Sequence, residues 1–239
     1  MKNIKLFAAA EGFLFGVAMF FMLLDKNGGP EGLMSRRLYE DQAIEYHSGD
    51  SDLVESIASE FTDVVGYLTV EGTSIDYPVM RDRTDSEGNY YYLDHNYTGQ
   101  PDPSGCPFIR HSVRLDDDLL EVFAHNNSNG TMFADLVRFE DDDFFNDYGN
   151  IVFDTVEGRR TYQVSAVLDV DVYGDDYTFW GWHNFPDESA ESEFISQIES
   201  NASVKSDEGL TSGNQYLLLV TCEYSHPNGR RIVVAVRTS

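Results

Sequence analysis

The chain has 239 residues, of which 41% are hydrophobic and 13% aromatic, enough to build one sizeable core. Sixteen Lys and Arg against 42 Asp and Glu leave a formal net charge of -26, which would repel a phosphate backbone and argues against nucleic-acid binding. The two cysteines, Cys106 and Cys222, permit one disulfide but no zinc motif, and the histidines show no metal-ligand spacing, so we expect no metal and no cofactor.

The N-terminus carries a pattern typical of a membrane anchor. Residues 6–24 form a 19-residue apolar stretch interrupted only by Glu11. As a helix this stretch would be roughly 28 Å long, about one bilayer core. Lys2 and Lys5 precede it, so the positive-inside rule places the N-terminus in the cytoplasm. We therefore expect residues 1–24 to be an uncleaved signal anchor of a single-pass membrane protein, with a cleaved signal peptide as the alternative.

Residues 25–62 are expected to form a stalk and two helices ahead of the core. The stretch DKNGGPEG is typical of a flexible connection, and residues 33–47 have helical character. Asp52 and Glu55 then form a capping-box pattern, followed by apolar residues at helical spacing.

Residues 63–239 consist mainly of short β-rich runs. VVGYLTV and TSIDYPVM, separated by the dipeptide EG, predict a hairpin. Further strands are predicted at residues 119–125, 150–154, 161–171, 216–222 and 230–237. So many short strands with few helices between them predict a mostly β domain, either an antiparallel barrel or a sandwich.

Two segments interrupt this pattern. Residues 135–148 are rich in acidic side chains that could bind a cation, but a short solvated helix with Phe139, Phe144 and Phe145 packed inward explains them better. Residues 174–214 form a 41-residue excursion before the penultimate strand, with a helix predicted near residues 191–200. An insertion of this length is either functional or disordered.

The last two predicted strands bring together two chemically useful side chains. Residues 227–229, Pro-Asn-Gly, favour a chain reversal. If Cys222 lies opposite Arg230 in the resulting hairpin, the two side chains share one face and Arg231 points to the other. A register slip of one residue would exchange the two arginines.

A thiol needs a proton acceptor to become a nucleophile, and the sequence offers two candidates. His125 ends an apolar strand and opens an Asn-rich and Gly-rich loop, a common place for active-site groups. His226 is close to Cys222 in sequence but lies in the turn. Considered singly, Cys222 also fits a buried thiol and Arg230 a surface charge.

Whole motifs extend this reading. LVTC followed by R-x-I-x-V resembles the TLxTC motif and downstream arginine of the sortases, membrane-anchored cysteine transpeptidases of Gram-positive bacteria. AHNNSNGTMFADL resembles the sortase segment GHNxxxGxMFxxL, which carries the catalytic histidine. VVGYLTVEGTSIDYPVM and GNIVFDT resemble the sortase strands GWLxIxGTxIDYPV and HxxIxFDT. The paired N-terminal helices and the helical excursion are most like class B sortases.

The resemblance implies a closed antiparallel sortase-type β-barrel over residues 63–239, with two N-terminal helices and a helix-containing insertion before the penultimate strand. It assigns the catalytic positions to His125, Cys222 and Arg230. The candidate substrate-binding residues are those beside the nucleophile, and one early in the excursion: Thr221, Glu223, Tyr224 and Tyr177. Cys106 is expected to be structural.

The implied activity is cleavage of a C-terminal sorting signal on a secreted protein through a thioacyl enzyme. An amine of a peptidoglycan precursor or a pilin lysine would then accept the acyl group, outside the cell and without a cofactor. Two alternatives stay open. One is an inactive binding or assembly module on the same barrel. The other is a cysteine peptidase, although papain-like enzymes place the cysteine before the histidine.

Overall fold

The computed structural model describes residues 51–84, 90–175, 177–225 and 228–239. The predicted anchor, the stalk and the first predicted helix lie outside these residues, as does His226. Within the described part of the chain, no helix is both long enough and apolar enough to cross a membrane.

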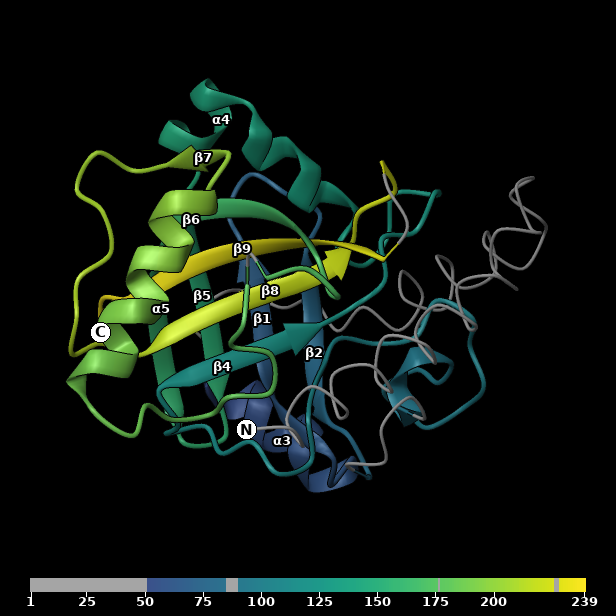
Figure 1. The fold of residues 1–239 in the computed structure, drawn as a ribbon. Helices are drawn as coiled ribbons and strands as arrows, with labels where there is room; N and C mark the ends of the chain where they lie inside the picture. Colours follow the sequence, from purple (N-terminus) through teal and green to yellow (C-terminus); the bar gives the residue numbers. More distant parts are fainter. Residues whose placement is uncertain (1–50, 85–89, 176, 226–227) are drawn as a thin grey trace.

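One nine-stranded sheet dominates the described residues (Figure 1). The elements in chain order are α3 (Ser51–Glu60), β1 (Val64–Val70), β2 (Asp76–Arg81), the 3-10 helix η1 (Tyr91–Leu93), β3 (Phe108–Ile109), β4 (Leu119–Phe123), the 3-10 helix η2 (Ala134–Glu140), α4 (Asp142–Asp147), β5 (Asn150–Thr155), β6 (Gly158–Asp171), α5 (Glu188–Asn201), β7 (Val204–Lys205), β8 (Tyr216–Cys222) and β9 (Gly229–Arg237).

The sheet closes into a barrel. Its strand order is β5-β1-β2-β3-β4-β8-β9-β6-β7, and β5 also pairs with β6, so that eight strands form a ring and β7 extends it from β6. The predicted mostly β closed barrel is confirmed. Two of its pairings, β2–β3 and β4–β8, are parallel, and the others are antiparallel as expected.

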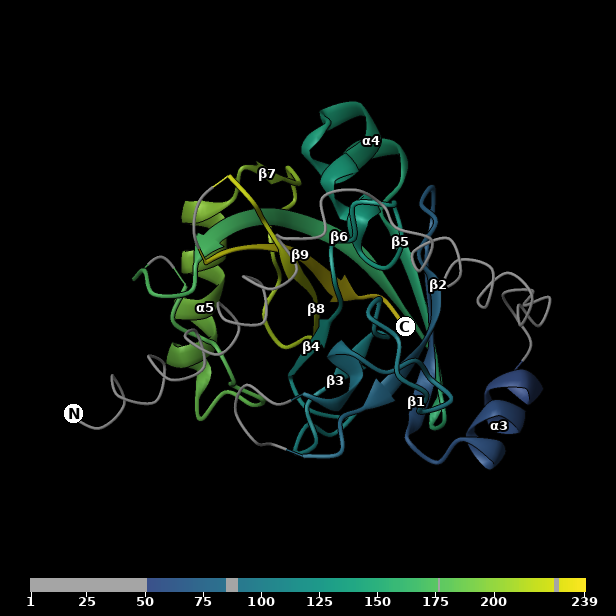
Figure 2. The same cartoon turned by 90° about the vertical axis from the view of Figure 1, so that its right-hand side faces the viewer.

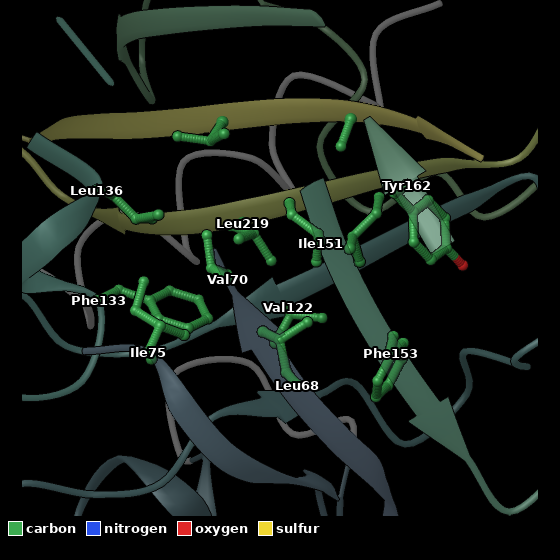
Figure 3. Packing of buried hydrophobic residues seen from close by; sticks show 14 of the residues in the cluster. Leu68, Val70, Ile75, Val122, Phe133, Leu136, Ile151, Phe153, Tyr162 and Leu219 are labelled. Atoms are coloured by element: carbon green, nitrogen blue, oxygen red, sulfur yellow. The ribbon is translucent and has the colours of Figure 1, made fainter. Parts of the chain in front are cut away.

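The position of β8 in the barrel explains why its sequence is apolar along its whole length. Leu217 and Leu219 face the barrel interior, part of which is drawn in Figure 3. Leu218 and Val220 face a second apolar cluster outside the barrel. Because both faces are covered, no polar alternation appears, and each buried side chain contributes roughly 1.5–3 kcal/mol.

Helices cover parts of the outer face. The excursion contributes α5, whose Phe194 and Ile198 are buried in the outer cluster, and the carboxylate of Asp187 caps its first turn. Helix α3 confirms the second predicted N-terminal helix and lies on the opposite side of the barrel from α5 (Figure 2). In η2 and α4, the residues predicted to pack inward are buried: Phe139, Phe144 and Phe145.

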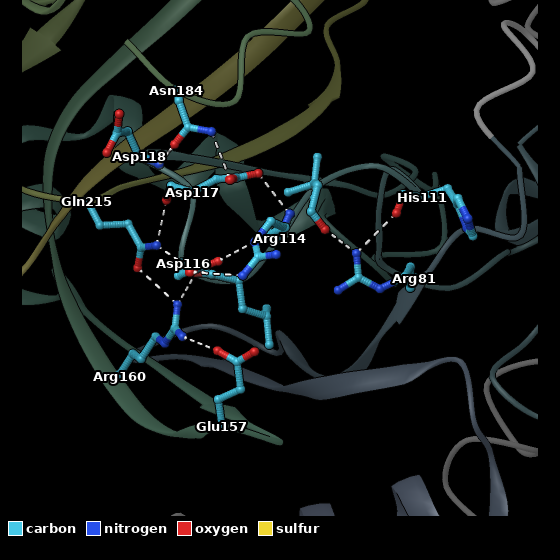
Figure 4. Close-up of polar contacts among 12 residues, drawn as sticks. Arg81, His111, Arg114, Asp116, Asp117, Asp118, Glu157, Arg160, Asn184 and Gln215 are labelled. Atoms are coloured by element: carbon cyan, nitrogen blue, oxygen red, sulfur yellow. Dashed lines mark hydrogen bonds and ion pairs between the residues drawn. The ribbon is translucent and has the colours of Figure 1, made fainter. Parts of the chain in front are cut away.

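The excursion is held against the barrel by polar contacts to the loop before β4 (Figure 4). Asn184 Nδ2 donates to Asp117 Oδ1 at 2.9 Å, and the backbone amide of Phe185 donates to Asp118 Oδ2 at 2.9 Å. The amide of Leu119 donates to the carbonyl of His183 at 2.9 Å. These bonds anchor the middle of the excursion at the start of the strand that leads to His125.

Candidate active site

The final hairpin has the predicted register. Cys222, the last residue of β8, pairs with Arg230 on β9, and Val220 pairs with Ile232. The reversal between them contains Asn228 with a φ of 64°, a left-handed conformation that asparagine tolerates well. The side chain of Cys222 is 9% exposed, and Arg230 is buried beside it.

Arg231 lies on the other face of the same hairpin. Its Nε donates to Asp169 Oδ1 at 2.9 Å and its Nη2 to Asp169 Oδ2 at 2.8 Å. Nη2 also bonds Glu140 of η2. The prediction that the two arginines point to opposite faces is therefore confirmed. Arg231 forms ion pairs that join β9 to β6 and η2.

The parallel pairing of β4 with β8 places His125 relative to Cys222. Phe123 lies level with Val220, and the two strands run in the same direction, as their arrowheads in Figure 1 show. Beyond Phe123, where β4 ends, two side-chain hydrogen bonds keep the chain beside β8, one from Thr221 to the carbonyl of Ala124 and one from Asn126 to the carbonyl of Cys222. His125, two residues past the end of β4, therefore lies beside the pair of Cys222 with Arg230, and the charge of Arg230 acts on its pKa.

Three hydrogen bonds tie the two strand ends together beyond the regular pairing. Thr221 Oγ1 donates to the carbonyl of Ala124 at 2.8 Å. Asn126 Nδ2 donates to the carbonyl of Cys222 at 2.9 Å, and Tyr224 Oη donates to the carbonyl of Asn126 at 2.9 Å. The residues on both sides of His125 are therefore attached to the strand that carries the thiol.

The imidazole of His125 is oriented by a backbone group. Its Nε2 lies 2.8 Å from the carbonyl oxygen of Leu93, at the end of η1. A carbonyl can only accept, so Nε2 carries the proton of the neutral ring and Nδ1 is the nitrogen left to accept one. Burial lowers the pKa of His125 and Arg230 lowers it further, while the bond to Leu93 and the charge of Asp94 oppose that shift.

The thiol has the opposite shift. Burial raises the pKa of Cys222, and the positive charge of Arg230 partly reverses this effect. With the pKa of His125 lowered and that of Cys222 raised, the neutral thiol and neutral imidazole are the main forms at neutral pH. The site can perform nucleophilic chemistry, with the reactive ion pair as a minor state at neutral pH.

Comparison with known proteins supports the same reading. No family model matches the chain. In sequence it is 27% identical to sortase B of Listeria monocytogenes over 175 residues, covering 72% of this chain and 68% of that protein. It is 26% identical to sortase B of Staphylococcus aureus over 185 residues, covering 76% and 72%. The structure of Clostridium perfringens sortase B superposes with a TM-score of 0.69 at 26% identity, over 77% of this chain and 99% of that one. These similarities support a sortase of class B. They indicate that the chain is a cysteine transpeptidase.

In this sortase, two of the four predicted substrate-binding residues lie at the surface beside the nucleophile. Tyr224 is 53% exposed, and burial of its hydroxyl together with the thiol of Cys222 raises its pKa to about 12. Glu223 accepts from the amide and the hydroxyl of Ser225 at 2.8 and 2.6 Å. Both residues stay predicted substrate contacts.

The other two predicted substrate-binding residues are buried in this sortase. Thr221 is 3% exposed, faces the barrel interior and bonds Ala124, an arrangement that suits support of the site rather than contact with a peptide. Tyr177 is 1% exposed and packs in the outer cluster near the ion pair of Arg110 with Glu121, whose charged atoms are 3.0 Å apart. Tyr177 can therefore affect the outer surface of the barrel only by supporting the side chains that cover it.

Cys106 and Cys222 are not joined to each other, so the disulfide that composition permitted does not form. Cys106 is buried in the outer cluster, and its Sγ donates to the carbonyl of Pro78 at 3.4 Å, which agrees with a structural role. Across the described residues, His, Cys, Asp and Glu form no group of three or more able to hold a metal.

Two groups at this site were not found from the sequence. Asn126 directly follows His125 and could have been noted on that ground, but its link to Cys222 spans 96 residues. Leu93 contributes only its carbonyl oxygen, a group that every residue has. A backbone contribution of this kind leaves no signal in the sequence.

Proposed function

We propose that this sortase cleaves a C-terminal sorting signal of secreted proteins and joins the new carboxyl end to an amine. The transpeptidase activity follows from the family; the catalytic residues, the substrate and the location are the proposal. The observation that carries it is that His125, two residues past the end of β4, lies beside the pair of Cys222 on β8 with Arg230 on β9.

In the first step, His125 accepts the thiol proton of Cys222 and the thiolate attacks the carbonyl carbon of the scissile peptide bond. The carbonyl oxygen becomes an oxyanion. The amide of Glu223, next to the nucleophile, already donates to the carbonyl of Gly229 at 3.0 Å. Arg230 Nη1 donates to the same carbonyl at 2.8 Å, but a guanidinium has five N–H groups whereas an amide has one, so Arg230 is the donor that we assign to the oxyanion or to the adjacent substrate backbone.

The tetrahedral intermediate then collapses. The C–N bond breaks, its electron pair goes to the leaving nitrogen, and His125 returns its proton there, which leaves a thioester on Cys222. An acceptor amine attacks this thioester, His125 takes the excess proton from the amine, and the C–S bond breaks to regenerate the thiolate. One amide is exchanged for another, so the reaction needs neither a redox partner nor a cofactor.

The proposed location follows from the N-terminal sequence. Residues 1–24 would anchor the protein in the cell membrane, residues 25–62 would carry the stalk and helices, and residues 63–239 would form the catalytic barrel outside the cell. Secreted proteins and amines of peptidoglycan precursors or pilins are the partners available there.

The test uses the full chain in detergent with a library of sorting-signal peptides and an amine acceptor, and Cys222→Ala as the matched control. We expect amine-linked product from the wild-type protein and none from the variant. Product from Cys222→Ala would refute the nucleophile assignment. Hydrolysis without amine transfer would favour a peptidase, and absence of any turnover by the wild-type protein would favour a binding module.

A further inference from the structure

We propose that Asn126 is a positioning residue, whose side-chain amide keeps His125 aligned with the thiol of Cys222. This inference rests on the proposed function and adds to it a residue that does not itself touch the substrate. It concerns the point where the backbone pairing between β4 and β8 ends.

Regular pairing between these two strands stops just before the catalytic residues. The last paired residues are Phe123 and Val220, and the amide of Ala124 still donates to the carbonyl of Val220 at 3.2 Å. Beyond that point, the strands are joined by side chains: Thr221 bonds the carbonyl of Ala124, and Asn126 bonds the carbonyl of Cys222. His125 lies between these two attachments.

Asn126 is itself held from two other directions. Its carbonyl accepts the hydroxyl of Tyr224 at 2.9 Å, and its backbone pairs with Met132 across the loop. Met132 is fully buried with a φ of 59°, an uncommon conformation for a residue other than glycine, and its amide donates to Tyr77 Oη at 3.2 Å. These contacts fix the loop that carries Asn126. The hydrogen bond from the Asn126 side chain therefore holds the backbone of Cys222 at a defined position relative to this loop and to His125.

This arrangement bears on proton transfer. A general base must lie within hydrogen-bond reach of the proton that it takes, and a misplacement of about 1 Å can reduce the rate as much as 100-fold. The hydrogen bond to the Leu93 carbonyl fixes the rotation of the imidazole ring, but it does not fix where His125 lies along the direction of β8. The bond from Asn126 to the backbone of Cys222 does so directly.

The first test compares Asn126→Ala with Asn127→Ala in the full chain. Asn127 lies in the same loop, but its amide bonds Thr131 at 3.0 Å, within that loop. We expect Asn126→Ala to lower kcat/KM for amine transfer by about 10- to 100-fold, through kcat and with little change in KM, and Asn127→Ala to change it little. A loss of less than about twofold in Asn126→Ala, or an equal loss in the control, would overturn the proposal.

A conservative variant sharpens the test. In Asn126→Asp the ionised carboxylate cannot donate to the Cys222 carbonyl, whereas the protonated carboxyl can. The activity of this variant relative to wild type should therefore rise as the pH falls toward the ordinary aspartate pKa of about 4, while the Asn126→Ala ratio stays flat. Parallel ratios for the two variants would show that the donated hydrogen bond is not what matters.

A readout without substrate separates this inference from the proposed function. Alkylation of Cys222 by iodoacetamide depends on removal of the thiol proton, and Cys222→Ala gives the background from Cys106. We expect alkylation at neutral pH to be severalfold slower in Asn126→Ala and unchanged in Asn127→Ala. Unchanged alkylation in Asn126→Ala, with only a lower melting temperature, would assign Asn126 a purely structural role, whether or not any peptide is cleaved.

Discussion

Four polar side chains project from the hairpin where β8 ends and β9 begins, two on each face. On the outer face Cys222 lies opposite Arg230, beside the segment that carries His125. On the inner face Thr221 lies opposite Arg231. Each face therefore has one small side chain with a hydroxyl or thiol and one guanidinium, at the same height on the same two strands.

The surroundings of the two faces differ. Arg231 is paired with the carboxylates of Asp169 and Glu140, and Thr221 bonds a backbone carbonyl, so the polar groups of the inner face stabilise the fold. On the outer face, Arg230 acts on the pKa values of both Cys222 and His125. Because alternate side chains along a strand point to opposite sides, neighbours in sequence can have unrelated roles.

The largest effect should come from Arg230→Ala. Removal of one oxyanion donor typically lowers kcat by about 100- to 1000-fold, and we expect kcat/KM for amine transfer to fall by that factor. Arg230→Lys, which keeps the charge but loses the planar donor geometry, should recover part of the activity. If Arg230→Ala instead kept activity within about tenfold of wild type, the oxyanion assignment would fail.

The pH dependence offers a second distinction between the two arginines. With the pKa of His125 lowered from 6.5 and that of Cys222 raised from 9.0, kcat/KM should form a broad bell whose acid limb lies below the first value and whose alkaline limb lies above the second. Arg230 lowers both pKa values, so its removal should raise both.

The shift caused by Arg230→Ala is best measured from the pH dependence of Cys222 alkylation, because turnover will be slow. Arg231→Ala is the matched control and should leave the alkylation profile unchanged. An equal shift in the two variants would mean that the thiol responds to the overall charge of the hairpin rather than to the face on which the arginine lies.

Arg231→Ala should affect stability instead. The change leaves Asp169 and Glu140 without their shared cation, and since both carboxylates are partly exposed we expect the free energy of unfolding to drop by about 1–3 kcal/mol. Denaturant titration measures this, and kcat/KM per folded molecule should stay close to wild type. A loss of turnover as large as that of Arg230→Ala would reverse the roles assigned to the two faces.

The smallest effect should come from Thr221→Val, which keeps the shape of the side chain and removes the bond to Ala124. We expect a loss of about 1 kcal/mol in the free energy of unfolding and only a few-fold fall in kcat/KM. A rise in KM with unchanged stability would instead support the direct substrate contact predicted for Thr221 from its position beside the nucleophile.

Local patterns in the sequence were enough to predict the final hairpin, and the alternation of side chains along β9 is enough to assign Arg230 and Arg231 to opposite faces. The register that pairs Cys222 with Arg230 had to be assumed, because both faces of β8 and β9 are apolar and the sequence does not distinguish one face from the other. The limits of β1 and β8 were also predicted to the residue, because turn-forming or polar residues bound both runs.

The tertiary structure alone decided how His125 meets Cys222. That meeting depends on parallel pairing between β4 and β8, which are nearly 100 residues apart and are held together by apolar clusters on both faces of the sheet. The Leu93 carbonyl and the Asn126 amide join the site through the same long-range contact. Sequence determines a pairing when neighbouring residues form it, whereas here the barrel core selects the partner strand and so completes the site.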